Sequence, residues 1–302
     1  MSRHRFHLVN VFASSALSGN ALCVFEDGSV LTDEQMQALA LQFNLSETTF
    51  LFPSTVATAR VRIFTPSFEM PFAGHPTLGS AHVFRMLRPD AGDAVTLEMQ
   101  AGIIPVGAAG DVWTLQARPP RVRAAEATRP ETAAMLGLQE SDLGADVQAP
   151  ARIATMADVA DAADAADVMW VDTGSEQLVV PLRSPEAVAR CRVDAVLLAK
   201  HASNARGDGL AYVWAREHDA ALVARFFFLK SGSLVEDPGT GSACANLGGW
   251  LVATGAPLPT ALCIRQGEHT GRACHLGLRV DHEKRIYVTG NVIAIATGEV
   301  TL

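Results

Sequence analysis

One glutamate with hydroxyl neighbours is the first candidate for acid–base chemistry in this sequence. Glu47 is flanked by Ser46, Thr48 and Thr49 in a short polar segment that precedes an apolar run. Hydroxyls can hold a carboxylate there, and partial removal from water would raise its pKa, which suits proton transfer near neutral pH. An exposed loop glutamate is the alternative interpretation, and this segment alone leaves both open.

Two further candidates belong to a phrase that occurs twice. Residues 75–81 read HPTLGSA and residues 237–243 read DPGTGSA, 162 positions apart. Each copy has a polar residue, a proline and then small residues, which is typical of a helix start. His75 can relay a proton or satisfy loop carbonyls. Asp237 can orient a substrate amine or hydroxyl, or simply cap the helix.

The doubling of this phrase also predicts where an anion would bind. A helix N-terminus presents free backbone N–H groups at the positive end of its dipole. Two such ends, one in each half of the chain, predict a shared cleft with a ligand between them. Two tight strand-to-helix turns, with glycine present for packing, are the structural alternative.

The composition bounds the class of protein. The chain has 302 residues, of which 49% are hydrophobic and 19% charged, so we expect a folded protein with room for two domains. The net charge of −8 argues against nucleic-acid or acidic-membrane partners. No run approaches the roughly 20 apolar residues of a membrane span. The N-terminal residues lack the apolar core of a secretory signal, so we expect a cytoplasmic protein.

No metal or cofactor motif occurs in the sequence. The five cysteines are widely spaced, without C-x-x-C, and most are expected to be buried free thiols. The histidines lack metal-site spacing, and no Walker or dinucleotide-binding loop is present. The Ala/Asp-rich run 157–167 lacks the glycine and terminal glutamate of a calcium loop, which favours a solvated acidic helix face.

The elements that must position these groups are mostly strands. Short apolar runs predict strands, and Thr32 with Gln35 predicts a capped helix. A second helix is expected from His75 to about residue 87, and another at 240–252. The charged stretch 118–129 predicts a boundary between domains 1–118 and 119–289, and strand 290–302 is a candidate to rejoin the first. The strands are expected at 6–12, 21–25, 49–52, 60–65, 94–99, 102–106, 112–117, 169–172, 177–182, 210–214, 221–228 and from 262 onward.

Three of these segments together resemble the PhzF-like isomerases of phenazine biosynthesis. They are residues 44–48 (NLSET), 71–79 (PFAGHPTLG) and 236–243 (EDPGTGSA), and the resemblance extends over essentially the whole chain. It implies an α+β fold of the diaminopimelate-epimerase type. Two pseudo-symmetric domains would each wrap a mixed sheet or barrel round a central helix, with the active site in the cleft between them. A cofactor-free isomerase and a homodimer are also implied.

The resemblance implies roles for particular residues. The proton shuttle falls on Glu47, and two further active-site groups fall on His75 and Asp237. Gly74 and Ser242 would help to bind substrate. Related epimerases and racemases use a pair of cysteines that this chain lacks, and Cys244 is not expected to replace them. Residues 273–274 (Ala-Cys) depart from the Pro-Ser usual in such proteins.

The function expected from the sequence is a proton-transfer isomerase, similar to trans-2,3-dihydro-3-hydroxyanthranilate isomerase. Its partner would be a small carboxylate substrate. A racemase or epimerase of an amino or hydroxy acid, and a non-catalytic small-molecule-binding homodimer, are the alternatives. The missing cysteine pair argues against the first, and the intact Glu47, His75 and Asp237 argue against the second. The expected substrate-binding residues are Gly74, Pro76, Thr77, Gly239, Thr240, Gly241 and Ser242.

Overall fold

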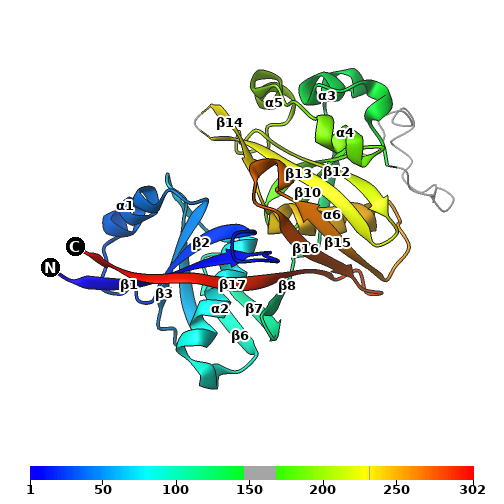
Figure 1. Ribbon diagram of the computed structural model, residues 1–302. Coiled ribbons are helices and arrows are strands. Elements are labelled where there is room, and N and C mark those ends of the chain that lie inside the picture. Colours follow the sequence, from blue (N-terminus) through cyan, green and yellow to red (C-terminus); the bar gives the residue numbers. More distant parts are fainter. Residues whose placement is uncertain (146–167, 231) are drawn as a thin grey trace. The chain divides into compact units, whose positions relative to one another are not determined.

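A computed structural model describes residues 1–145, 168–230 and 232–302 in two compact units (Figure 1). Unit 1 comprises Met1–Gln116, Gly271–Leu276 and Tyr287–Leu302. Unit 2 comprises Ala117–Thr270 and Gly277–Ile286. The short segment Gly271–Leu276, which the sequence analysis placed in the second domain, thus belongs to unit 1. The Ala/Asp-rich run 157–167 lies outside the described residues.

Eight strands of unit 1 form a closed barrel. Pairing runs in the order β1–β2–β3–β4–β6–β7–β8–β17 and returns from β17 to β1, so no edge of the barrel is left open. The pairs β2–β3 and β4–β6 are parallel and the others antiparallel. The strands predicted in this half are confirmed, and the short β5 (Glu69–Met70) was missed. The barrel strands are β1 (Arg3–Val11), β2 (Asn20–Phe25), β3 (Glu47–Phe52), β4 (Ala59–Phe64), β6 (Ala94–Met99), β7 (Gly102–Ala109), β8 (Val112–Gln116) and β17 (Ile286–Thr301).

One helix fills this barrel. Helix α2 (Gly74–Leu87) has ten consecutive buried residues, because seven of the barrel strands pack around it. Its small residues permit close contact with the wall. A Cβ on Gly79 would lie 2.5 Å from Leu22 Cδ2, so glycine is required there. The predicted buried central helix is therefore confirmed (Figure 1).

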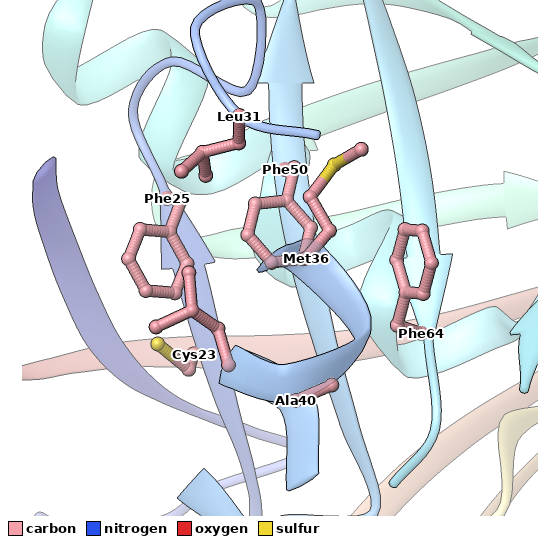
Figure 2. Close-up of a cluster of buried hydrophobic side chains, with 8 residues drawn as sticks. Cys23, Phe25, Leu31, Met36, Ala40, Phe50 and Phe64 are labelled. Atoms are coloured by element: carbon pink, nitrogen blue, oxygen red, sulfur yellow. The ribbon is translucent and has the colours of Figure 1, made fainter. Parts of the chain in front are cut away.

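The other helix of unit 1, α1 (Asp33–Phe43), packs on the outer face of the barrel. Thr32 and Gln35 form the predicted capping box at its start. Figure 2 shows its apolar face meeting side chains of β2, β3 and β4. Side chains alternate along a strand, so Phe50 of β3 points to α1 while Thr49 points inward to α2. This buried cluster consists of Cys23, Phe25, Leu31, Met36, Leu39, Ala40, Phe50 and Phe64.

Unit 2 repeats the plan of a sheet around a buried helix. Its strands pair in the order β9–β10–β11–β12–β13, and both β14 and β15 pair with the far edge of β13. Helix α6 (Gly241–Ala253) is almost wholly buried against β9, β10 and β11. The strands are β9 (Arg121–Ala124), β10 (Met169–Asp172), β11 (Glu176–Pro181), β12 (Leu210–His218), β13 (Ala221–Lys230), β14 (Ser233–Asp237) and β15 (Thr260–Gln266), and β16 (Cys274–Val280) has residues in both units.

Besides α6, the described residues of unit 2 form three short α-helices: α3 (Arg129–Leu136), α4 (Pro185–Arg190) and α5 (Ala195–His201). Strand β9 lies inside the charged stretch that the sequence predicted as a boundary. Its four residues pair with β10, so this part of the stretch belongs to the sheet. Strand β14 and helix α5 were also missed, because each is short and carries no periodic apolar signal.

Strand register shows which residues of the two units correspond. Thr48 pairs with Phe64, and Ala211 pairs with Phe227, 163 positions later. The central helices start at Gly74 and Gly241, 167 positions apart. The doubled phrase is therefore five residues out of register with the helices. Its first copy lies inside α2, whereas the second reaches α6 only at its fifth residue, Gly241, one residue after the predicted start of that helix.

Candidate functional site

The predicted glutamate and histidine meet in unit 1. Glu47 is the first residue of β3, and His75 is the second residue of α2. His75 Nε2 lies 3.4 Å from Glu47 Oε2, and their side chains are only 6% and 15% exposed. Glu47 faces the helix because Thr49, two residues on, accepts a hydrogen bond from Ser80 of α2. The strand and the helix together bring an acid and an imidazole into contact.

Thr48, one of the hydroxyl residues expected to hold Glu47, does not do so. Thr48 lies on the opposite face of β3, and its Oγ1 makes no hydrogen bond within the described residues. The Thr49 hydroxyl is engaged by Ser80 at 2.9 Å. The expectation fails because neighbouring side chains of a strand point to opposite faces, which a list of adjacent hydroxyls does not reveal.

His75 is neutral at physiological pH. Burial lowers the pKa of its ring to about 3, and a hydrogen bond with the Ala21 backbone acts in the opposite direction. That bond commits one ring N–H to a carbonyl. Nε2, which makes no hydrogen bond within the described residues, then turns its lone pair toward the Glu47 carboxyl group. The contact is therefore not an ion pair, and it can hold or pass a single proton.

In unit 2, Asp237 is fixed by a short polar loop. The Thr240 hydroxyl donates to Asp237 Oδ2 at 2.5 Å. Gln266 Nε2 donates to the Asp237 carbonyl oxygen at 2.9 Å and to Thr240 Oγ1 at 3.0 Å. Asp237 ends strand β14 and does not cap α6, because the N-cap residue is Thr240.

The starts of the two central helices differ from those of the other helices. Of the six α-helices in the described residues, α1, α3, α4 and α5 have an N-cap side chain that accepts a backbone hydrogen bond. Neither Ala73 before α2 nor Thr240 before α6 does so. The Thr240 hydroxyl is turned to Asp237 instead. First-turn N–H groups at these two helices can therefore serve a ligand, and an anionic one suits the helix dipole.

Ser242, the second residue of α6, accepts a hydrogen bond from Gln177 Nε2 at 2.9 Å. Gln177 in turn contacts Asn246, one turn further along the helix. Sequence reasoning missed both amides. The available signal was a polar side chain inside an otherwise apolar run, in residues 177–182 and again in 243–251.

The remaining predicted residues fall into the same two groups. Gly74 and Pro76 are buried in the first turn of α2, and Gly239 and Gly241 are buried beside Thr240. Thr77 is fully buried, and its hydroxyl donates to the Ala73 carbonyl and to Met99, so this side chain secures the helix start. Burial raises the pKa of the Cys244 thiol, which agrees with the expectation that Cys244 is not a base.

Within residues 1–145, 168–230 and 232–302, no three His, Cys, Asp or Glu side chains are grouped as a metal ion would require. No helix in those same ranges combines the length and apolar character needed to cross a bilayer.

Known proteins resemble this chain, some over nearly its whole length and others over about a third of it. A family model described as phenazine biosynthesis-like protein, PhzC-PhzF, matches residues 9–298. An uncharacterized isomerase of Pasteurella multocida is 38% identical, over 99% of this chain and 94% of its own. The trans-2,3-dihydro-3-hydroxyanthranilate isomerase of Pseudomonas aeruginosa is 44% identical over 103 residues, which are 34% of this chain and 36% of that protein.

Solved structures confirm the expected fold. A PhzF-family protein of Bacillus anthracis matches with a TM-score of 0.83 at 22% identity, over 100% of both chains. A hydroxyproline epimerase of Agrobacterium vitis matches with a TM-score of 0.60 at 12% identity, over 99% of this chain and 93% of that one. At such identities the likeness establishes architecture and not activity.

Proposed function

We propose a function for a chain that belongs to the PhzC-PhzF family of phenazine-biosynthesis-like proteins. The chain is a cofactor-independent isomerase that moves a proton between two atoms of a small carboxylated substrate. The observation that supports this most directly is the contact between Glu47 and a neutral His75 at the start of a central helix without a side-chain cap.

Glu47 serves as the general base and then as the general acid. Its carboxylate takes a proton from a substrate carbon, and the electron pair of that C–H bond moves into the neighbouring unsaturated system. The same proton then forms a new bond at another carbon, so no oxidant or reductant is consumed. His75 supports both steps, because its Nε2 lone pair can accept a hydrogen bond from the protonated Glu47.

Unit 2 supplies the groups that hold the substrate. We assign Asp237 to a substrate amine or hydroxyl, since Thr240 already fixes its carboxylate through one oxygen. The N–H groups of Gly241 and Ser242 suit a carboxylate, because they stand at the positive end of α6. We propose that these groups and the Glu47–His75 pair act on one substrate molecule.

The relatives narrow the substrate class. Several are named isomerases, and three are named for trans-2,3-dihydro-3-hydroxyanthranilate, although these match only 34%, 26% and 26% of this chain. We therefore propose cyclic, unsaturated amino or hydroxy carboxylates as substrates. Such molecules have both an acidic C–H bond and a conjugated path along which its electron pair can move.

Turnover in deuterated water tests this proposal. Trans-2,3-dihydro-3-hydroxyanthranilate is incubated with the protein, and the product is followed by proton NMR. We expect an isomer with deuterium at the reprotonated carbon, to the extent that Glu47 exchanges its proton with solvent between the two steps. No isomerisation of this compound or of a panel of cyclic unsaturated carboxylates would refute the function. Inversion at one carbon without a shifted double bond would indicate an epimerase instead.

A further inference from the structure

Two buried amides in unit 2 stand where unit 1 has an apolar contact. Asn246 is 0% exposed and Gln177 is 3% exposed. Asn246 lies five residues after the start of α6, and Gly79 lies five after the start of α2. Leu178 of β11 pairs with Ala211, and Cys23 of β2 pairs with Thr48, the unit 1 counterpart of Ala211. Gln177, one residue before Leu178, therefore corresponds to Leu22, one residue before Cys23.

The unit 1 counterpart of this pair is therefore Leu22 against Gly79. There a Cβ on the glycine would lie 2.5 Å from Leu22 Cδ2, so the contact is tight and apolar. The fold accepts apolar packing at this position. Buried amides cost desolvation that their hydrogen bonds only balance. Asn246 satisfies backbone groups of Thr173 and Ser175, whereas Gln177 connects Asn246 to Ser242, so a role beyond packing is indicated for Gln177.

Backbone groups fix which way Asn246 is turned. The Thr173 N–H, which can only donate, reaches Asn246 Oδ1 at 2.9 Å. The Ser175 carbonyl, which can only accept, lies 2.8 Å from Asn246 Nδ2. Asn246 Nδ2 must then donate to Gln177 Oε1, at 2.9 Å. Gln177 consequently presents its Nε2 donor to Ser242 Oγ, also at 2.9 Å.

This order of hydrogen-bond donors determines whether the Ser242 hydroxyl can donate a hydrogen bond to a ligand. Its oxygen already accepts from Gln177, so its own hydroxyl proton is available to a different acceptor. Ser242 is the second residue of α6 and only partly buried, beside the N–H groups that the Thr240 side chain leaves uncapped. A group bound there meets hydrogen-bond donors from both the serine and the helix start.

We propose that Asn246 and Gln177, the amide relay, are positioning residues that fix Ser242 as a hydrogen-bond donor to the substrate. The subsite then accepts a carboxylate or carbonyl oxygen and disfavours an ammonium group. The inference rests on the proposed function only in that Ser242 contacts substrate. The direction of the relay is a property of unit 2 alone and can be measured without substrate.

A thiol at position 242 reports that direction. Ser242→Cys is made together with Cys263→Ser, because Cys263 is the exposed cysteine and the other four are buried. The pH dependence of alkylation by iodoacetamide, with the modified peptide identified by mass spectrometry, gives the pKa of the introduced thiol. A Gln177 donor stabilises the thiolate, so Gln177→Leu should raise this pKa by about one pH unit. An unchanged or lowered pKa would overturn the relay.

Two further variants guard against misfolding and test the relay's link to turnover. Gln177→Leu with Asn246→Gly recreates the unit 1 pair and should raise the thiol pKa equally. This double variant also removes the acceptor of the Thr173 N–H, so circular dichroism is used to check that its fold is retained. With Ser242 intact, Gln177→Leu should lower kcat/KM about tenfold, and in a Ser242→Ala background it should have no further effect. Independent effects of the two substitutions would contradict action through Ser242. A raised thiol pKa without isomerase turnover would refute the proposed function and leave the relay intact.

Discussion

In both units an arginine, a glutamate and a phenylalanine side chain anchor the short strand that precedes the central helix, β5 in unit 1 and β14 in unit 2. Arg62 of unit 1 makes a two-point contact with Glu69 at 2.7 Å and lies over the Phe64 ring. Arg225 of unit 2 makes the same contact with Glu236, at 3.1 and 2.8 Å, over the Phe227 ring. These arginines correspond by strand register, so the arrangement is a shared part of the scaffold.

The two arginines differ in what else they hold. Arg62 reaches Asp33 in the first turn of the outer helix α1, at 2.6 Å. Arg225 instead donates to carbonyl oxygens at the end of α4, including that of Cys191 at 3.0 Å. A cation suits either partner, a carboxylate or the negative end of a helix. The corresponding arginines thus contact opposite ends of an outer helix: the N-terminus of α1 in unit 1 and the C-terminus of α4 in unit 2.

Chemical groups have diverged where the scaffold has not. By strand register Glu47 corresponds to Leu210, and by helix register His75 corresponds to Ser242. Glu69 is followed by Met70, whereas Glu236 is followed by Asp237. Unit 1 thus has the acid–base pair and unit 2 has hydrogen-bonding groups. This division favours one base over the two opposed bases of a racemase.

The largest effect on turnover is expected from substitution of Glu47, the proposed base in unit 1. Glu47→Gln keeps the shape of the side chain and removes the base, so turnover should fall by about 10² to 10⁴. The matched control is Leu210→Met at the corresponding position of unit 2, which should retain activity. Steady-state rates on any substrate identified in the NMR assay decide the matter. Equal losses in both variants would show that the two units contribute alike.

Removing the shared arginines should affect stability unequally. Arg225→Ala should cost up to about 3 kcal/mol of unfolding free energy, because it leaves Glu236, whose side chain is only 15% exposed, without its cation. Arg62→Ala should cost less, because Glu69 is slightly more exposed and Asp33 lies at the surface. Urea denaturation measures both. Arg225→Met with Glu236→Leu should recover much of the loss, and a larger cost at Arg62 would contradict the comparison.

His75 should make unit 1 sensitive to acid in a way that Ser242 cannot. The unfolded chain protonates this histidine below its ordinary pKa of 6.5, whereas the folded ring does so only near 3. The unfolded state therefore binds more protons in this window, and stability falls as the pH drops. The loss from this group is about 2 kcal/mol at pH 5. His75→Gln should show a correspondingly smaller drop between pH 7.5 and 5 in urea denaturation, and equal drops would count against burial of a neutral ring.

The smallest effect concerns helix caps. Thr32→Ala removes the capping hydroxyl of outer helix α1 and should cost about 1 kcal/mol in thermal or urea unfolding. Thr32→Ser should restore most of it, and neither variant should alter turnover. The capping pattern implies that the starts of outer helices serve stability and those of central helices serve function. A change in turnover with Thr32→Ala would contradict that separation.

Local signals in the sequence predicted more than its internal repeat did. The Thr32 capping box, the central helices and most strands follow from nearby residues, and the structure confirms them. The doubled phrase indicated the right regions in the wrong register, because α6 starts 14 residues after Phe227, whereas α2 starts 10 residues after the corresponding Phe64. The contact of Glu47 with His75 depends on which face of β3 each side chain occupies. A polar side chain in an apolar run marks each member of the amide relay, but their contact depends on packing between α6 and β11, which no local pattern encodes.

The position of β17 in the barrel has a consequence for how this protein is made. Residues near the start of the chain pair with residues near its end, as Arg5 does with Glu299 across 294 positions. During synthesis, β1 and β8 must therefore remain as open edges until the last strand leaves the ribosome. Contacts of such long range slow folding, and unpaired edges invite association with other chains. Most of unit 2 is synthesised as one continuous stretch and can assemble earlier, so late aggregation should originate in unit 1.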